Sequence, residues 1–501
     1  MITVQKDWFE QTEIECFISA VHYPGNSLKG ILPLIDESLD GQIGELIKSG
    51  DIPSNKKSVT VIHTLGKIKT KRIIFVGLGR EKEVTDEIWK ESFAKGLRKA
   101  RELGAKTVSI DFDSFGTDSI SAEKAAQYTG ETYMLSLYEF NGYKQRNTKP
   151  DKQIERLVFY TKQPFDQLKA AVDKGFIYGK GTNYARTLVN LPPNILTANT
   201  LAEYAANTAE KYGFGLEVLK KDEMLELGMG ALLAVNQGSA EEPAMIVLTY
   251  QGKPEWNDVL ALVGKGVTYD TGGYSLKPRD GLIGMKSDMG GAAAVLGAME
   301  IIGERKPKQN VVAVIAATDN MVSASAFKPD DVITSLSGLT IEVLNTDAEG
   351  RLALADAVTY AKHHGADYII DAATLTGGIV VALGREMTGA FTNDRFLYEQ
   401  VERAAYLSGE PIWQLPITEK DRDRVRGSKI ADLNNSPGRD GHAIMGAAFV
   451  GEFAGETPWV HLDIAGTATT KAPNNLQAAG GTGVMARTLA ELVEDFRAKQ
   501  R

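Results

Sequence analysis

The sequence contains one cysteine, Cys16, in 501 residues. A single thiol cannot form an intramolecular disulfide, and it cannot supply the thiolate cluster that a structural zinc site requires. A fold that needs no disulfide suits a reducing compartment. We therefore expect a cytoplasmic protein.

Histidine is also scarce, and its six residues are His22, His63, His363, His364, His442 and His461. None lies in an H-E-x-x-H pattern, and none has a plausible second ligand at helical spacing. We interpret each as a surface or packing residue. Any metal site in this chain must then be built from carboxylates.

The sequence has no apolar run near the ~18–20 residues needed to span a bilayer, and Asp7, Glu10, Glu13 and Glu15 occupy the place of a signal peptide's apolar core. The 56 basic residues are outnumbered by 65 acidic ones, which gives a net charge of −9. This balance argues against nucleic acid as the main partner, because phosphate binding needs a concentrated basic face.

The sequence does have the composition of a globular protein, with 43% hydrophobic and 24% charged residues. Its length exceeds the roughly 250–300 residues that one core supports, so we expect two domains. In the first, strands at 71–79, 106–112 and 155–161 and a helix at 83–103 predict parallel α/β units.

A long helix is predicted over 165–190, where prolines at 192 and 193 end it. Continuous apolar strands then alternate with helices, which indicates a sheet covered on both faces; the strands are 244–250, 259–267, 311–317 and 367–375. We expect this sheet to be mixed and flanked by helices. We place an N-terminal α/β domain at 1–165, a connecting helix at 166–185 and a larger α/β domain at 186–501.

Two segments gather acidic and basic residues at predicted strand ends. In the first, Lys265 and Asp270 follow an apolar strand, Lys277 follows a Gly272-Gly273 turn, and Asp288 precedes small residues that would open a helix. Ligands bind at the carboxyl ends of strands in open α/β sheets.

In the second segment, Asp347, Glu349 and Arg351 alternate, so an extended stretch would place all three on one face, with a buried helix from Leu352 onward. Converging carboxylates repel one another, and two divalent ions would relieve that repulsion. A deprotonated Lys265 could add a ligand, whereas Arg351 stays charged and could hold an anion.

Each segment alone also fits a plainer interpretation. Glycines beside acidic residues commonly form turns, and Asp347 or Asp288 could cap a helix. Lys265 and Lys277 could be solvated loop residues. The two segments together favour a dinuclear metal site.

The octapeptide NTDAEGRL at 345–352 resembles the signature of the leucyl aminopeptidase (cytosol aminopeptidase) family, and VGKGVTYDTGGYSLKP at 263–278 resembles its other metal segment. The likeness continues in order through the blocks at 188–197, 371–378, 431–435 and 459–467. The resemblance implies an aminopeptidase that releases N-terminal leucine and other apolar residues from peptides.

The resemblance also implies the site residues. One metal would be bound by Lys265, Asp270, Asp288 and Glu349, and the other by Asp270, Asp347 and Glu349, with the carbonyl of Asp347. Lys277 and Arg351 would be catalytic, and Arg351 would hold a bicarbonate ion as general base. The substrate pocket would contain Met285, Asn345, Thr374, Leu375, Gly377 and Ala465.

By the same resemblance, water activated by two divalent ions (Zn²⁺, Mn²⁺ or Co²⁺) attacks the first peptide bond of a peptide with a free N-terminus. The family forms homohexamers, and its smaller N-terminal domain has a macro-like α/β fold. This sequence departs from the family at Thr271, Tyr269 and Tyr274, and at His442, where Gly is usual and where we expect a surface histidine.

Three other interpretations remain at this stage. Gly77-Leu78-Gly79 lacks the third glycine of a dinucleotide site, so it indicates an ordinary strand-to-helix turn. A dinuclear phosphoesterase would also use bridging carboxylates, but it typically adds histidine ligands. DNA binding would need a basic groove, which the net charge does not support.

Overall fold

The computed structural model describes residues 2–5, 14–24, 28–145 and 152–499. The chain divides into two compact units, residues 1–180 with 472–478 and residues 181–471 with 479–501. The border lies within the long helix α5 (Phe165–Asn190), whose bounds agree with the helix expected from the sequence. The domain limits given by the sequence patterns stay a prediction. In the described residues, no helix is both long and apolar enough to cross a membrane.

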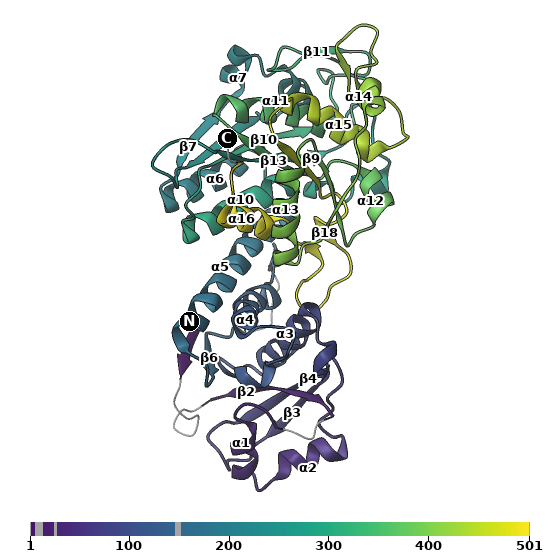
Figure 1. Cartoon of the computed structure of the whole chain (residues 1–501). Helices are drawn as coiled ribbons and strands as arrows, with labels where there is room; N and C mark the ends of the chain where they lie inside the picture. The colour runs from purple at the N-terminus through teal and green to yellow at the C-terminus, as the bar shows by residue number, and fades with distance from the viewer. Residues whose placement is uncertain (1, 6–13, 25–27, 146–151, 500–501) are drawn as a thin grey trace. The chain divides into compact units, whose positions relative to one another are not determined.

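The first unit is built on a six-stranded sheet in the order β1-β6-β5-β2-β4-β3 (Figure 1). All neighbouring strands are parallel except β3, which pairs antiparallel with β4. Its elements up to α5 are β1 (Ile2–Gln5), β2 (Cys16–Tyr23), α1 (Leu32–Ser38), α2 (Gln42–Ser49), β3 (Val59–His63), β4 (Arg72–Arg80), η2 (Glu81–Glu83), α3 (Asp86–Glu102), β5 (Thr107–Asp111), η3 (Phe112–Phe115), α4 (Ala122–Leu137) and β6 (Arg156–Tyr160).

The glycines at 77 and 79 were expected to form a strand-to-helix turn, and that expectation is wrong. Both lie inside β4, and α3 begins only at Asp86. The chain before β3 crosses close to this strand: a Cβ at Gly77 would lie 2.1 Å from the carbonyl oxygen of Asn55. Glycine is needed there for close backbone approach, not for a turn or a phosphate.

The second unit is built on an eight-stranded mixed sheet in the order β15-β14-β17-β13-β9-β10-β8-β7. Its elements after α5 are α6 (Ala198–Tyr212), β7 (Gly215–Leu219), α7 (Lys221–Leu227), α8 (Gly230–Asn236), β8 (Ala244–Tyr250), β9 (Leu260–Asp270), α9 (Arg279–Leu282), η4 (Met285–Ser287), α10 (Gly290–Arg305), β10 (Val311–Asn320), β11 (Val332–Thr334), β12 (Thr340–Glu342), α11 (Glu349–His363), β13 (Tyr368–Ala373), α12 (Gly377–Leu383), β14 (Thr388–Thr392), α13 (Arg395–Ser408), β15 (Ile412–Gln414), α14 (Glu419–Val425), β16 (Leu433–Asn434), α15 (His442–Ala454), β17 (Trp459–Asp463), β18 (Thr469–Thr470), β19 (Gly480–Gly481) and α16 (Ala486–Asp495).

The four central strands, β17, β13, β9 and β10, run parallel, so their carboxyl ends lie along one edge of the sheet. Alternate residues of β10, such as Val312 and Val314, pack in the cluster that contains α11. The intervening residues, such as Ile315, are equally buried, and α10 also packs on β9 and β10. Helices therefore cover both faces, which confirms the α/β fold expected from continuous apolar strands.

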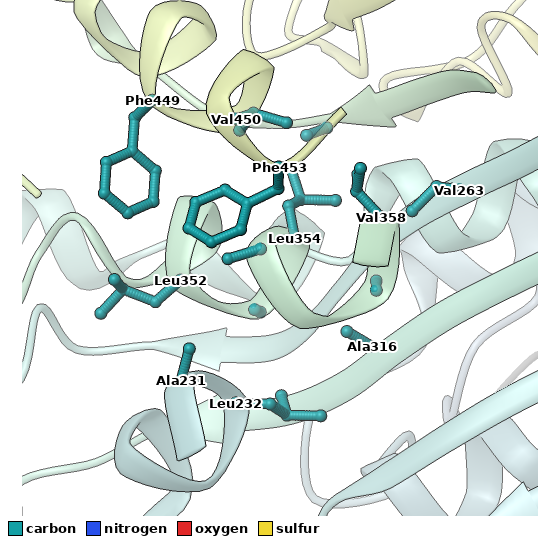
Figure 2. Close-up of a cluster of buried hydrophobic side chains, with 14 of the residues drawn as sticks. Ala231, Leu232, Val263, Ala316, Leu352, Leu354, Val358, Phe449, Val450 and Phe453 are labelled. Carbon is teal, nitrogen blue, oxygen red and sulfur yellow. The ribbon is translucent and has the colours of Figure 1, made fainter. Parts of the chain in front are cut away.

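Helix α11 lies at the centre of the larger core (Figure 2). Its Leu352, Leu354 and Val358 meet Phe449 and Phe453 of α15, together with side chains of α8, β9 and β10. A helix that is apolar on nearly all sides is held by its neighbours rather than by its own propensity. Its first turn is consequently placed rigidly beside the sheet edge.

The polar Asp356 of α11 is also fully buried. The two carboxylate oxygens of Asp356 accept hydrogen bonds from the backbone N–H groups of Leu232 and Leu336, each at 2.8 Å. Burial raises the pKa of Asp356 to about 7, although those hydrogen bonds oppose the shift. Asp356 thus joins α11 to the start of α8 and to the turn after β11.

We expect Asp356→Ala to destabilise the second unit, because two buried N–H groups would lose their acceptor at about 1–3 kcal/mol each. Asp356→Asn keeps one acceptor oxygen and should lose less. Urea unfolding followed by circular dichroism measures both changes. An unfolding midpoint of Asp356→Ala equal to that of the unmodified protein would contradict this role.

Candidate functional site

The sequence-predicted site residues converge at the carboxyl ends of the central parallel strands. Lys265 and Asp270 belong to β9, Thr374 directly follows β13, and Ala465 lies two residues after the end of β17. Asn320, the last residue of β10, pairs in register with Asp270. This is the edge at which an open α/β sheet binds ligands.

Asp270 is held by the turn that follows it. Its Oδ1 accepts hydrogen bonds from the N–H of Gly272 at 2.8 Å and from Nδ2 of Asn320 at 2.9 Å. Gly272 has φ +84°, and a Cβ there would lie 2.7 Å from a carboxylate oxygen of Asp347. The turn requires glycine both for its left-handed backbone and for the close approach of the two acids.

Lys265 is almost fully buried among acids. Its Nζ lies 2.8 Å from Oδ2 of Asp288, 2.9 Å from Oε1 of Glu349 and 2.9 Å from the carbonyl oxygen of Thr374. A Cβ at Gly350 would lie 2.4 Å from Cε of Lys265. The glycine of the octapeptide therefore lets the lysine pass beside the first turn of α11.

Lys277 bridges the other two acids. Its Nζ lies 2.6 Å from Oδ2 of Asp270 and also bonds Oδ1 of Asp347. Carboxylate oxygens of Asp270, Asp347 and Glu349 all lie within 4.8 Å of one another. Four carboxylates, counting Asp288, face two amines, so the formal charge of the cluster is −4 + 2 = −2.

The loop before α11 is held by asparagine side chains. Oδ1 of the buried Asn435 accepts from the N–H of Leu344 at 2.8 Å, and its Nδ2 donates to the carbonyl of Asn345 at 2.7 Å. Oδ1 of Asn345 in turn accepts the N–H of Asp347 at 2.9 Å. These bonds position the backbone that carries the Asp347 side chain.

The expectation that Asp347, Glu349 and Arg351 alternate along an extended stretch is wrong. Helix α11 begins at Glu349, three residues before the buried helix expected from Leu352 onward. Glu349 and Arg351 thus lie in the first turn of a helix, and Asp347 lies in the loop before it. Tertiary packing of α11 overrides the two-residue periodicity.

Burial raises the pKa values of these acids, and like charges add to the effect. The pKa of Glu349 is raised to about 8, mainly by burial and then by the charge of Asp270. Burial also raises the pKa values of Asp288 and Asp347. Burial opposes charge on Lys265 and Lys277 as well, but the surrounding carboxylates raise the pKa of both amines above the ordinary value. The cluster therefore favours additional positive charge.

Arg351 is fully buried behind the cluster. Its Nη1 donates to the carbonyl of Asn435 at 2.7 Å, and its Nε has no hydrogen-bond partner among the described residues. Burial lowers the pKa of Arg351 to about 10, which leaves it protonated at neutral pH. A buried cation with an unused donor is suited to holding an anion.

Most residues of the expected site line one cavity of about 480 Å³. The expected residues found there are Lys265, Asp270, Lys277, Met285, Asp288, Asp347, Glu349, Thr374, Leu375, Gly377 and Ala465. Asn345 lines a second cavity of about 670 Å³ instead. Arg351 is not among the lining residues of either cavity.

Sequence reasoning missed Asp463, the last residue of β17. Its Oδ1 accepts from the N–H groups of Leu375 and Ala465 at 3.2 Å, and its Oδ2 accepts from Oγ1 of Thr376 at 2.7 Å. It therefore joins the two loops that form one wall of the first cavity. A charged residue within the apolar block at 459–467 was the available signal.

Arg385, Lys471 and Ala468 also line the first cavity and were not expected there. His442 was expected at the surface, but it is half-buried and lines both cavities. These positions come from loops and helix starts, where periodicity carries no information on which side chains meet.

Two family models match the chain. The cytosol aminopeptidase family catalytic domain matches residues 183–490, and the N-terminal domain of the same family matches residues 22–147. A probable cytosol aminopeptidase from Bacillus licheniformis is 58% identical over 462 residues, which cover 92% of this chain and 93% of that protein.

Solved structures agree with these matches. A mutant of tomato leucine aminopeptidase has a TM-score of 0.85 at 32% identity, over 98% of this chain and 96% of that one. The bottromycin maturation enzyme BotP in complex with Mn has a TM-score of 0.84 at 30% identity, over 96% of this chain and 99% of that one.

Proposed function

The chain belongs to the cytosol aminopeptidase family, and on that premise we propose that it releases N-terminal residues, preferably leucine and other apolar residues, from peptides with a free N-terminus. The observation that carries this proposal is the buried cluster of carboxylates and lysines inside the first cavity. Apolar side chains such as Met285, Leu375 and Ala465 support the preference for an apolar first residue.

We assign two divalent ions, Zn²⁺, Mn²⁺ or Co²⁺, to the cluster. Lys265, Asp270, Asp288 and Glu349 would bind one, and Asp270, Asp347 and Glu349 the other, with the carbonyl of Asp347. The net negative charge, the hard oxygen ligands and the manganese complex of BotP support this assignment. When bound, the two ions polarise the peptide carbonyl and lower the pKa of water.

Lys277 would stabilise the oxygen of the cleaved peptide group as negative charge develops on it. Its raised pKa keeps the amine protonated, so it remains a hydrogen-bond donor. The amine is only partly exposed, and a charge-assisted hydrogen bond is stronger where water is excluded.

Arg351 would hold a bicarbonate ion, which supplies a general base when bound. Two observations support this role: Nη1 is anchored on the carbonyl of Asn435, and Nε has no hydrogen-bond partner within the described part of the chain. Thr374 and Gly377 line the first cavity, and Asn345 lines the second. These residues would position the peptide on either side of the bond that is cleaved.

Removal of metal should abolish hydrolysis of leucinamide, because the carboxylate cluster alone cannot polarise the carbonyl. Activity measured after chelation, and again after adding Zn²⁺, Mn²⁺ or Co²⁺ singly, tests this expectation. Hydrolysis that continues without metal would refute the central assignment. Lack of phosphate release from a model phosphate ester under the same conditions separates this activity from that of a phosphoesterase.

Lys277→Ala and Arg351→Ala should each lower kcat for leucinamide by about 10²–10⁴-fold. The surface variant Lys328→Ala is a suitable control, since Lys328 forms an exposed ion pair with Asp331. Steady-state kinetics of metal-loaded protein gives the comparison. Full activity of either site variant would exclude its assigned role.

We further propose that the protein works in the cytoplasm as a homohexamer. The location is supported by the cytosolic name of the Bacillus licheniformis relative. The assembly rests on the family resemblance. Sedimentation velocity measures the number of subunits directly, and a monomer at micromolar concentration would contradict the assembly.

A further inference from the structure

Two cavities meet at the proposed catalytic site, and His442 stands at their junction. The first, of about 480 Å³, contains the cluster of carboxylates and lysines, and the second has a volume of about 670 Å³. Asp347, Gly377 and His442 line both. Asp347 and Gly377 already have assigned roles, whereas the proposed chemistry leaves His442 unused.

The position of the imidazole is built into the fold. His442 begins α15, which packs on α12, and Gly378 lies in the first turn of α12. A Cβ at Gly378 would lie 2.8 Å from Cβ of His442 and 3.2 Å from its Nδ1. The space beside the ring therefore exists because residue 378 is glycine.

The ring has unused hydrogen-bonding capacity. In the part of the chain that the structure describes, neither ring nitrogen of His442 forms a hydrogen bond or an ion pair. Burial lowers the pKa of His442, and the charge of Arg351 lowers it further, so the ring is neutral at neutral pH. A neutral imidazole offers one donor and one acceptor, which matches a peptide group.

The two cavities differ in chemistry. Lys265, Asp270 and Glu349 line only the first, whereas Val381, Leu415 and Ile444 line only the second. A peptide cleaved at the cluster with its first residue in the first cavity must continue past the junction. Its second residue then enters the second cavity beside the imidazole.

We propose that His442 is a specificity-determining residue that hydrogen-bonds the second residue of the peptide, on the amine-leaving side of the cleaved bond. This inference rests on the proposed aminopeptidase function. It predicts that His442 affects substrates that have a second residue and not those that lack one.

The test compares leucinamide with the dipeptide Leu-Ala, using metal-loaded protein. His442→Ala should raise KM for Leu-Ala by about 5–10-fold, the effect of one lost hydrogen bond, with kcat changed by less than about two-fold. Both constants for leucinamide should stay within about two-fold. His442→Gln should restore KM for Leu-Ala, because an amide also donates and accepts.

The exposed His363 on α11 provides the matched control, and His363→Ala should leave both substrates unaffected. Equal losses on both substrates, or no loss on Leu-Ala, would overturn the inference. Failure of the proposed function looks different, because the unmodified protein with added metal would then cleave neither substrate.

Discussion

Lys265 places its amine within 2.9 Å of Asp288 and Glu349 in a position that water barely reaches, and Lys277 does the same between Asp270 and Asp347 with somewhat more exposure. Burying charge is costly unless the charge is paired. The geometry around the cluster meets this requirement: Gly350 makes room for Lys265, and Gly272 lets two acids approach. The surrounding loops and strand ends are arranged around a cluster of side chains whose formal charge is negative.

The first turn of α11 is supported by an apolar core. Helix α11 supplies Glu349 and Arg351 from its first turn while its remaining length is packed among α8, α15 and the central strands. A rigid, water-poor support holds side chains in place and strengthens every electrostatic interaction at the cluster. Among the described residues, this packing leaves the Nε of the buried Arg351 without a hydrogen-bond partner.

The first cavity does more than enclose the charges. Asp463 holds together the loops after β13 and β17, which form one wall of this cavity. His442 lines both this cavity and the second one. The two cavities differ in chemistry, because Lys265, Asp270 and Glu349 line only the first and Val381, Leu415 and Ile444 line only the second.

The sequence predicted buried strands such as β8 and β10, and also the helix α5. Continuous apolar runs and helix-ending prolines are local signals. The sequence also indicated which acids would gather, because the segments at 263–278 and 345–352 carry them, and the structure brings Asp270, Asp347 and Glu349 together. The tertiary structure alone decided that Glu349 is helical, that β4 contains Gly77 and Gly79, and that His442 faces two cavities. Those outcomes depend on contacts between segments far apart in the chain, and no local periodicity encodes such contacts.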